Sequence, residues 1–372
     1  MYMKITVLTD DLQKKLSFAS HAVSQRSQLP ILLNVLLETK EGKLQLSATD
    51  LEIGIETTMP ATIEEEGDIT VPAKLFLELV NSLPQDKVIL QTKGTTLDIS
   101  CRRVKSNLAG LPKEEFPALF EEKGDLVVTL SQENVKENFS RVCFASSNET
   151  TRPALSGILL DKQETGFVLV ATDGYRLSLQ QNVSVPESAV SPDDKPILIP
   201  ARVIRQVLSE KGNEQTSIYI SRQSKQVLFE HGDSVLIGRL IEAQYPKYQK
   251  IIPADFSTKI VFDKEEMQKA IKTCAIFARE TGNIIKLSLQ SNAVIISANT
   301  PSVGDNLVEV EAKLEGEENE IAFNAKYLLD FFANVDAQQM SFEMTGPLNP
   351  GVFRIVDDTS FLHLIMPIRT QG

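Results

Sequence analysis

The chain has 372 residues, of which 42% are hydrophobic and 24% are charged, so it has globular composition and is too long for one compact core. No stretch approaches the ~20 apolar residues of a membrane span, and the three cysteines are too far apart for CxxC chemistry. We therefore expect a cytoplasmic protein without disulfides or a membrane partner. The formal net charge of −12 argues against a nucleic-acid partner only if the charge is spread evenly.

The elements expected along the chain recur in three rounds. A first helix is expected after Thr9, Ser131 and Asp263, where a capping residue and early acids precede an apolar helical face. Alternating apolar runs then predict strands at Ile31–Leu37, Leu44–Ala48, Gly157–Leu160, Phe167–Ala171 and Val294–Ala298.

Two short sequence markers recur in the same order. The first is Ala48-Thr49-Asp50, Ala171-Thr172-Asp173 and Ala298-Asn299-Thr300, with alanines 123 and 127 residues apart. The second is Ala73-Lys74, Ala201-Arg202 and Ala325-Lys326, with alanines 128 and 124 residues apart, and each pair is expected to start a second helix. Both periods are close to a third of the chain. We therefore predict three similar α+β domains at 1–124, 125–253 and 254–372, each with two helices packed on antiparallel sheet.

A base stands at the start of each predicted second helix: Lys74, Arg202 and Lys326. On an ideal helix Arg202 and Arg205 share one face, while Ile204 and Val207 share another. Most such charges only solvate a helix. The same placement in three repeats favours a basic surface that follows a phosphate backbone without reading bases.

Catalytic and metal sites lack the residues they need. Asp50 and Asp173 could be paired carboxylates, but the third repeat has Asn299-Thr300, and turn-forming Asx chemistry explains all three markers better. The three histidines lie in different repeats without partners at metal or triad spacing, and there is no GxxxxGK[ST] loop. We expect no enzyme, no catalytic residue, no metal and no cofactor.

Three segments resemble the bacterial sliding clamp family, the beta subunits of DNA polymerase III. They are Ala171–Leu177, Tyr245–Tyr248 with Ile252-Pro253, and the ending Leu364–Arg369, and the resemblance covers the whole chain in order. It implies the DNA clamp fold and a homodimer of two three-domain chains, which close a six-domain ring around double-stranded DNA. The acid excess would lie outside this ring. Helices and their bases would line the hole and contact DNA without sequence specificity.

The resemblance also implies the partners and the site residues. The partners are the polymerase III alpha subunit, the clamp loader and other proteins with a short hydrophobic clamp-binding motif, and the protein would act in DNA replication at the nucleoid. The expected DNA-binding residues are Arg26, Lys74, Arg202 and Lys326, with Arg205 added from the helical-face argument. The expected peptide-binding residues are Arg152, Leu155, Thr172, Gly174, Tyr175, Arg176, Leu177, Pro246, Lys250, Ile251, Leu364, Ile365, Met366, Pro367, Ile368 and Arg369.

The expected dimer interface consists of Leu108, Ile276 and Phe277. Ile276 also indicates a partner surface by itself, because it lies opposite the apolar face of its predicted helix. Alternatives remain for several of these residues. Leu364–Ile368 could be only a final core strand, Arg26 could be a solvated loop residue, and the whole chain could be a passive acidic scaffold that binds peptides without encircling DNA.

Overall fold

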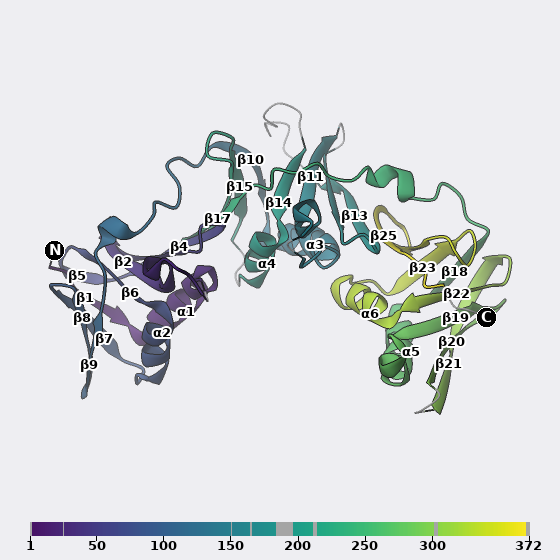
Figure 1. Cartoon of the computed structure of the whole chain (residues 1–372), viewed down its shortest axis with the longest axis horizontal. Coiled ribbons are helices and arrows are strands. Elements are labelled where there is room, and N and C mark those ends of the chain that lie inside the picture. The colour runs from purple at the N-terminus through teal and green to yellow at the C-terminus, as the bar shows by residue number, and fades with distance from the viewer. Residues whose placement is uncertain are drawn as a thin grey trace. The chain divides into compact units, whose positions relative to one another are not determined.

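The computed structural model describes residues 2–24, 26–149, 151–163, 166–183, 196–210, 214–300 and 304–369 (Figure 1). Its contacts divide the chain into two compact units. Among the described residues, unit one consists of those within 1–132 and 205–240, and unit two consists of those within 133–204 and 241–372. Among the described residues, no helix has the length and apolar character needed to span a membrane.

Unit one contains a five-stranded antiparallel sheet. Its strands, in spatial order, are β5 (Thr62–Glu65), β1 (Lys4–Leu8), β7 (Lys87–Lys93), β8 (Thr96–Cys101) and β9 (Val104–Ala109). Helix α1 (Thr9–Ala19) packs against α2 (Ala73–Ser82), and the two helices bury Leu12, Leu16, Phe76 and Val80. These apolar residues recur at helical spacing, which is why each helix buries one face.

The second sheet of unit one is eight-stranded and antiparallel. Its order is β10 (Asp125–Leu130), β15 (Thr216–Ser221), β16 (Gln226–His231), β17 (Ser234–Arg239), β4 (Ile53–Pro60), β3 (Lys43–Thr49), β2 (Asn34–Lys40) and β6 (Asp68–Pro72). Helix α1 contacts β3 and β4 of this sheet. The sheet therefore joins strands of the first and second sequence repeats.

Unit two is built on a twelve-stranded antiparallel sheet. Its order is β14 (Ile197–Pro200), β11 (Gly157–Gln163), β12 (Gly166–Thr172), β13 (Arg176–Val183), β25 (Asp358–Ile365), β24 (Gly351–Ile355), β23 (Gln339–Met344), β18 (Thr258–Asp263), β21 (Gly304–Gly316), β20 (Ala293–Thr300), β19 (Ile284–Leu289) and β22 (Asn319–Asn324). This sheet joins strands of the second and third repeats.

The chain forms four further α-helices in its described second and third repeats. They are α3 (Gln132–Cys143), α4 (Ala201–Ser209), which crosses the division between the units, α5 (Lys264–Ala278) and α6 (Ala325–Asn334). Helices α5 and α6 pack on each other above an aromatic core that includes Phe331, Phe332 and Phe353. Short 3₁₀ turns occur at Ser20–Ala22, Pro30–Leu33, Lys113–Glu115, Pro153–Ser156, Tyr248–Ile251 and Arg279–Thr281.

The junction between repeats has the same construction twice. Strand β4 of the first repeat pairs with β17, and β13 of the second repeat pairs with β25. At each junction, a backbone N–H at the end of the second strand donates to the residue that precedes the first strand. Arg239 N donates to Glu52 O (2.9 Å), and Met366 N donates to Tyr175 O (2.8 Å). The sequence repeats are therefore repeats of structure as well.

Several local predictions are confirmed and three are wrong. The second helices begin at Ala73, Ala201 and Ala325 as the second marker predicts, and Asp263 caps α5 by accepting from Glu266 N (3.0 Å). Thr9 does not cap α1, because it lies inside the helix and its hydroxyl donates to Asp86 O (2.8 Å).

The two other errors concern strands. The segment predicted as the strand Ile31–Leu37 begins as a 3₁₀ turn, because Pro30 fixes φ in the helical range at its start, and the strand begins only at Asn34. Asn299 does not form a turn like Asp50 and Asp173, since it lies within β20.

Candidate functional site

The three bases predicted at the helix starts are exposed in the structure. Lys74, Arg202 and Lys326 are each the second residue of their helix, α2, α4 and α6. None of these three helices, whose residues are all described, has an acid in its first turn, whereas α1, α3 and α5 all do. A cation near a helix N-terminus opposes the helix dipole and costs about 0.3–1 kcal/mol. Helix stability therefore does not explain the placement.

Arg205 and Arg26 are also exposed. Arg205 lies on α4 with Arg202, while Ile204 and Val207 of the same helix are each 1% exposed, so the predicted polar and apolar faces are confirmed. Arg26 lies in a bend, where its carbonyl oxygen accepts from Ser24 Oγ (2.9 Å).

The turn between β12 and β13 is held by the side chains of Thr172 and Asp173. Thr172 Oγ1 accepts from Gly174 N (3.0 Å) and donates to Arg176 O (2.6 Å). Asp173 Oδ1 accepts from Tyr175 N (2.9 Å) and Arg176 N (3.0 Å). Gly174 has φ +93°, which glycine adopts without strain. Asp173 is therefore a turn-forming residue, as the Asx interpretation predicts.

The side chain of Arg176 is buried beneath the turn and binds other groups of the chain. Its side chain is 8% exposed and forms ion pairs with Asp173 (3.0 Å) and Asp330 (2.8 Å). It also donates to Phe144 O (2.9 Å), and its guanidinium lies 4.8 Å from the ring centroid of Tyr327. The guanidinium is thus occupied by groups of the chain, so Arg176 positions the turn. Asp330 and Tyr327 come from α6, about 150 residues away in sequence, and sequence reasoning missed both.

Three residues of the expected peptide site have exposed apolar side chains. Tyr175 is 62% exposed and stacks on Tyr327, Met366 is 38% exposed, and Ile251 is 45% exposed. A Cβ on Gly174 would lie 3.8 Å from Arg152 Nη1 and 4.0 Å from Leu155 Cδ1, so those two residues border the turn.

A cluster of buried residues packs beneath the exposed residues of the expected peptide site. Leu177, Leu364 and Tyr248 share one core cluster, against which Tyr245 packs. The Tyr245 hydroxyl donates to Val170 O (3.2 Å), and burial raises its pKa above the ordinary range. Tyr245 and Tyr248 anchor the segment that carries the exposed residues Pro246, Lys250 and Ile251.

The C-terminal segment contributes in two different ways. Strand β25 ends at Ile365, and both Leu364 and Ile365 are buried. Ile365 faces the aromatic core of the third repeat and not the Leu177 cluster, because neighbouring strand residues point to opposite faces. The core-strand alternative thus holds for these two residues. Beyond the strand, Met366 and Arg369 are exposed, and Pro367 and Ile368 are half-buried.

The predicted interface residues lie on different elements. Ile276 on α5 is 59% exposed, as predicted, and Phe277 is partly buried against the core of the third repeat. Leu108 on β9 is only 7% exposed, because it faces the core of its own sheet. Sequence reasoning missed Leu307 on β21, which is 63% exposed; its position in a run of alternating acids was the available signal.

Comparison with known proteins identifies the family to which this sequence is related. Family models described as the N-terminal, central and C-terminal domains of the DNA polymerase III beta subunit match residues 3–120, 129–247 and 249–369. The chain is 32% identical over 380 residues to the beta sliding clamp of Staphylococcus aureus, covering 99% of this chain and 100% of that protein.

Solved structures agree in fold over the full chain. The sliding clamp of Bacillus subtilis superposes with a TM-score of 0.91 at 28% identity, and that of Bartonella birtlesii, solved bound to griselimycin, with a TM-score of 0.93 at 28% identity; 100% of each chain is covered. With three consecutive domain matches over nearly all of its length, the chain belongs to the bacterial DNA polymerase III beta subunits, the non-catalytic sliding clamps that serve polymerase processivity.

Proposed function

We propose that two copies of this chain close a head-to-tail ring around duplex DNA, and that the ring tethers the polymerase III alpha subunit, the clamp loader and other partners through short hydrophobic peptides. The observation that carries the proposal is the base at the second position of α2, α4 and α6, without an acid in the first turn of any of them. Exposed backbone N–H groups at a helix N-terminus and an adjacent cation together favour a phosphate. Phosphate contacts carry no sequence information, so such a surface permits sliding.

The strand topology supports ring closure. Both junctions within the chain pair an inner strand of one repeat with the last strand of the next repeat, β4 with β17 and β13 with β25. The remaining counterparts are β21 in the third repeat and β9 in the first. Within the described part of the chain, β9 pairs only with β8, and the 304–311 half of β21 pairs only with β20. Pairing β9 of one copy with β21 of the other satisfies both edges twice in a symmetric dimer.

The repeated hairpins give the expected register of this pairing. In the first junction Leu236 lies opposite Ile55, which lies opposite Ala48 in the neighbouring strand. Ala298 lies opposite Asn306, so Asn306 corresponds to Ile55.

The outer strand follows in the same way. Ser234 closes the β16–β17 hairpin opposite His231, and Val104 closes the β8–β9 hairpin opposite Cys101, so Ser106 corresponds to Leu236. We therefore expect Lys105 to lie opposite Leu307 of the partner subunit.

Retention on DNA tests the proposal. The wild-type protein should stay on circular duplex DNA, leave when the circle is linearised, and become less bound as salt rises. The double variant Arg202→Glu with Arg205→Glu should lose most of this retention. Equal retention on circular and linear DNA would favour the passive scaffold, and equal retention of the variant would contradict the assignment of α4 to the DNA surface.

We further propose that the exposed apolar surface around the 172–177 turn, with Arg152, Ile251 and Met366, captures partner peptides. A few apolar anchors with a flexible methionine suit a surface that accepts several sequences. The Bartonella birtlesii clamp was solved bound to griselimycin. We propose that griselimycin binds this chain at the same surface and would therefore compete with partner peptides.

Fluorescence anisotropy of a labelled peptide with a Leu-Phe ending tests the peptide site. Removing residues from Met366 onward should abolish peptide binding and leave retention on circular DNA unchanged, and griselimycin should displace the peptide from the wild type. The Arg202→Glu/Arg205→Glu variant serves as the matched control and should bind the peptide normally. Undiminished affinity in the truncated chain would contradict the proposed site.

A further inference from the structure

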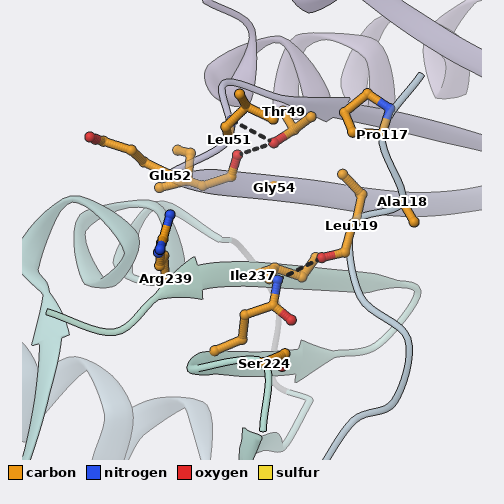
Figure 2. Close-up of a pocket in the computed structure, with 12 residues that line it drawn as sticks. Thr49, Leu51, Glu52, Gly54, Pro117, Ala118, Leu119, Ser224, Ile237 and Arg239 are labelled. Atoms are coloured by element: carbon orange, nitrogen blue, oxygen red, sulfur yellow. Dashed lines mark hydrogen bonds between the residues drawn. The ribbon is translucent and has the colours of Figure 1, made fainter. Parts of the chain in front are cut away.

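Unit one contains a pocket of about 180 Å³ where β4, β17 and residues 117–119 meet (Figure 2). Leu119 and Ile237 lie on one side of it, and Leu51, Glu52 and Arg239 lie on the other. The full lining consists of Thr49, Leu51, Glu52, Ile53, Gly54, Pro117, Ala118, Leu119, Ser224, Gln226, Ile237 and Arg239. No role in the proposed function involves these residues.

The pocket repeats the turn geometry of the 172–177 site. Thr49 Oγ1 accepts from Leu51 N (3.0 Å) and donates to Ile53 O (2.8 Å), as Thr172 does in its turn. Asp50 Oδ1 accepts from Glu52 N (3.0 Å) and Ile53 N (2.9 Å), as Asp173 does. By strand register Gly54 takes the place of Leu177, and Arg239 takes the place of Met366.

Two differences give this pocket its apolar part. Gly54 has no side chain where the other turn has leucine, and a Cβ there would lie only 3.3 Å from Leu119 Cδ2, so the glycine lets Leu119 and Ile237 approach β4 closely and form an apolar wall. Leu51 stands where the other turn has Gly174, with φ +76° and 54% of its side chain exposed. A leucine in the left-handed region is strained by roughly 1–2 kcal/mol. An exposed, strained leucine at the rim of a pocket is available for an apolar contact with a ligand.

The polar side chains of the lining include Gln226, Arg239 and the exposed carboxylate of Glu52. Gln226 Nε2 donates to Leu119 O (2.8 Å), while its Oε1 is buried and has no hydrogen-bond partner among the described residues. A buried unpaired acceptor costs about 1–3 kcal/mol, which a ligand N–H would recover. Arg239 is exposed and forms no ion pair within the described part of the chain. The pocket thus offers an acceptor, a cation and an apolar wall.

We propose that this pocket binds a second class of partner peptide, one in which an apolar side chain is followed by an aspartate or glutamate. The apolar side chain packs against Leu119 and Ile237 under the rim formed by Leu51. A backbone N–H of the peptide donates to Gln226 Oε1, and its carboxylate pairs with Arg239. The 172–177 site has Met366 in place of Arg239, so the two sites prefer different peptides. The inference rests on the geometry of unit one and is independent of the proposed function.

Methyl NMR of the full chain, labelled at leucine and isoleucine, tests the proposal with two matched probes. These are acetyl-Leu-Asp-methylamide and its neutral analogue acetyl-Leu-Asn-methylamide. The Leu119 and Ile237 methyl signals should shift at millimolar concentration, and the acidic probe should bind about tenfold more tightly, as expected for a charge-assisted hydrogen bond. Signals of Leu155 and Leu177 report binding at the other turn separately.

Three variants make the test specific. Arg239→Ala should remove the preference for the acidic probe, whereas Lys40→Ala, an exposed base of the same unit outside the pocket, should keep it. Gly54→Ala should weaken the binding of both probes while the remaining methyl spectrum stays that of the folded protein. The proposal is overturned if the Leu119 and Ile237 methyls do not shift up to about 10 mM probe, or if Arg239→Ala keeps the preference.

Discussion

Arg176 is one of the residues expected to bind a peptide, and its contacts within the chain support a role in positioning the turn. It is buried between Asp173, Asp330, Phe144 and Tyr327, while its neighbour Tyr175 is exposed. Along this single turn, the exposed residue of the proposed peptide site therefore stands next to the buried residue that supports it. Substitutions at the two positions should separate stability from binding.

Arg176→Ala should lower the free energy of unfolding by about 3 kcal/mol, because it leaves Asp173 and Asp330 without their buried partner. Tyr175→Ala should change that free energy by less than about 1 kcal/mol, because its side chain is mostly exposed, yet it should weaken binding of a Leu-Phe peptide. Urea unfolding and peptide anisotropy measure the two effects. A stable Arg176→Ala protein would contradict the positioning role.

His363 makes stability depend on pH. It is fully buried, its Nδ1 lies 2.6 Å from Ser178 Oγ, and its ring stacks on Phe331. Burial, and secondarily the charge of Arg176, lowers its pKa well below the ordinary 6.5. Below about pH 6.5 the His363 imidazole is therefore protonated in the unfolded chain but stays neutral in the folded chain. The free energy of unfolding falls as the pH drops through this range.

The variant His363→Phe should remove this part of the pH dependence. Between pH 6 and pH 5 the free energy of unfolding of the wild type should fall by up to about 1.4 kcal/mol per pH unit more than that of the variant, because one proton is taken up on unfolding. Adding Ser178→Ala avoids leaving that hydroxyl without its partner. Parallel stability curves for the wild type and the double variant, from urea unfolding at each pH, would contradict the role of His363.

At the scale of elements, the three second helices carry a charge that their own stability disfavours. Lys326 is the second residue of α6, and its N–H already donates to the cap Asn324 (2.9 Å). Lys326→Glu should therefore raise the free energy of unfolding by about 0.5 kcal/mol, because the acid favours the helix dipole. The same variant should reduce retention on circular DNA. Lys326→Gln should fall between the wild type and Lys326→Glu on both measures, and a gain in both stability and retention would contradict the phosphate role.

Local sequence signals predicted the elements well where one short segment decides the structure. The second helices start at the repeated alanines, and Asp263 caps α5, because a cap and a helical apolar face need only neighbouring residues. Thr9 could not be predicted, since its hydroxyl is occupied by Asp86 from another part of the chain. The same holds for the candidate site: the exposed face of α4 was predictable, whereas the burial of Arg176 depends on α6.

The pocket beside Gly54 could not be predicted from the sequence, because it also depends on residues from distant parts of the chain. Its turn carries the Thr-Asp marker, yet Leu51, Gly54 and Arg239 differ in kind from their counterparts Gly174, Leu177 and Met366. Only the strand register brings Gly54 and Ile237 together. Repetition of a backbone therefore does not imply repetition of a binding preference.

Within the described residues, β9 and the 304–311 half of β21 each have one edge without a paired strand, and their proposed pairing across the dimer predicts that cysteines placed there will link. The double variant Lys105→Cys with Leu307→Cys should form a disulfide-linked dimer on oxidation, because residues directly opposite in antiparallel strands are close enough for a disulfide. Asn107→Cys with Leu307→Cys, shifted by two residues, should link much less. The native cysteines are buried and should not interfere. Equal linking in both variants, judged on a non-reducing gel, would contradict the register.

Encirclement of the duplex by two chains can be tested with the covalent ring that these cysteines would form. The Lys105→Cys/Leu307→Cys protein is threaded onto linear DNA, the DNA ends are ligated, the cysteines are oxidised, and the sample is denatured in detergent. If two chains encircle the DNA, the unfolded protein should stay linked to the closed DNA circle until the circle is cut or the disulfides are reduced. Release by detergent alone, with both circles intact, would contradict encirclement.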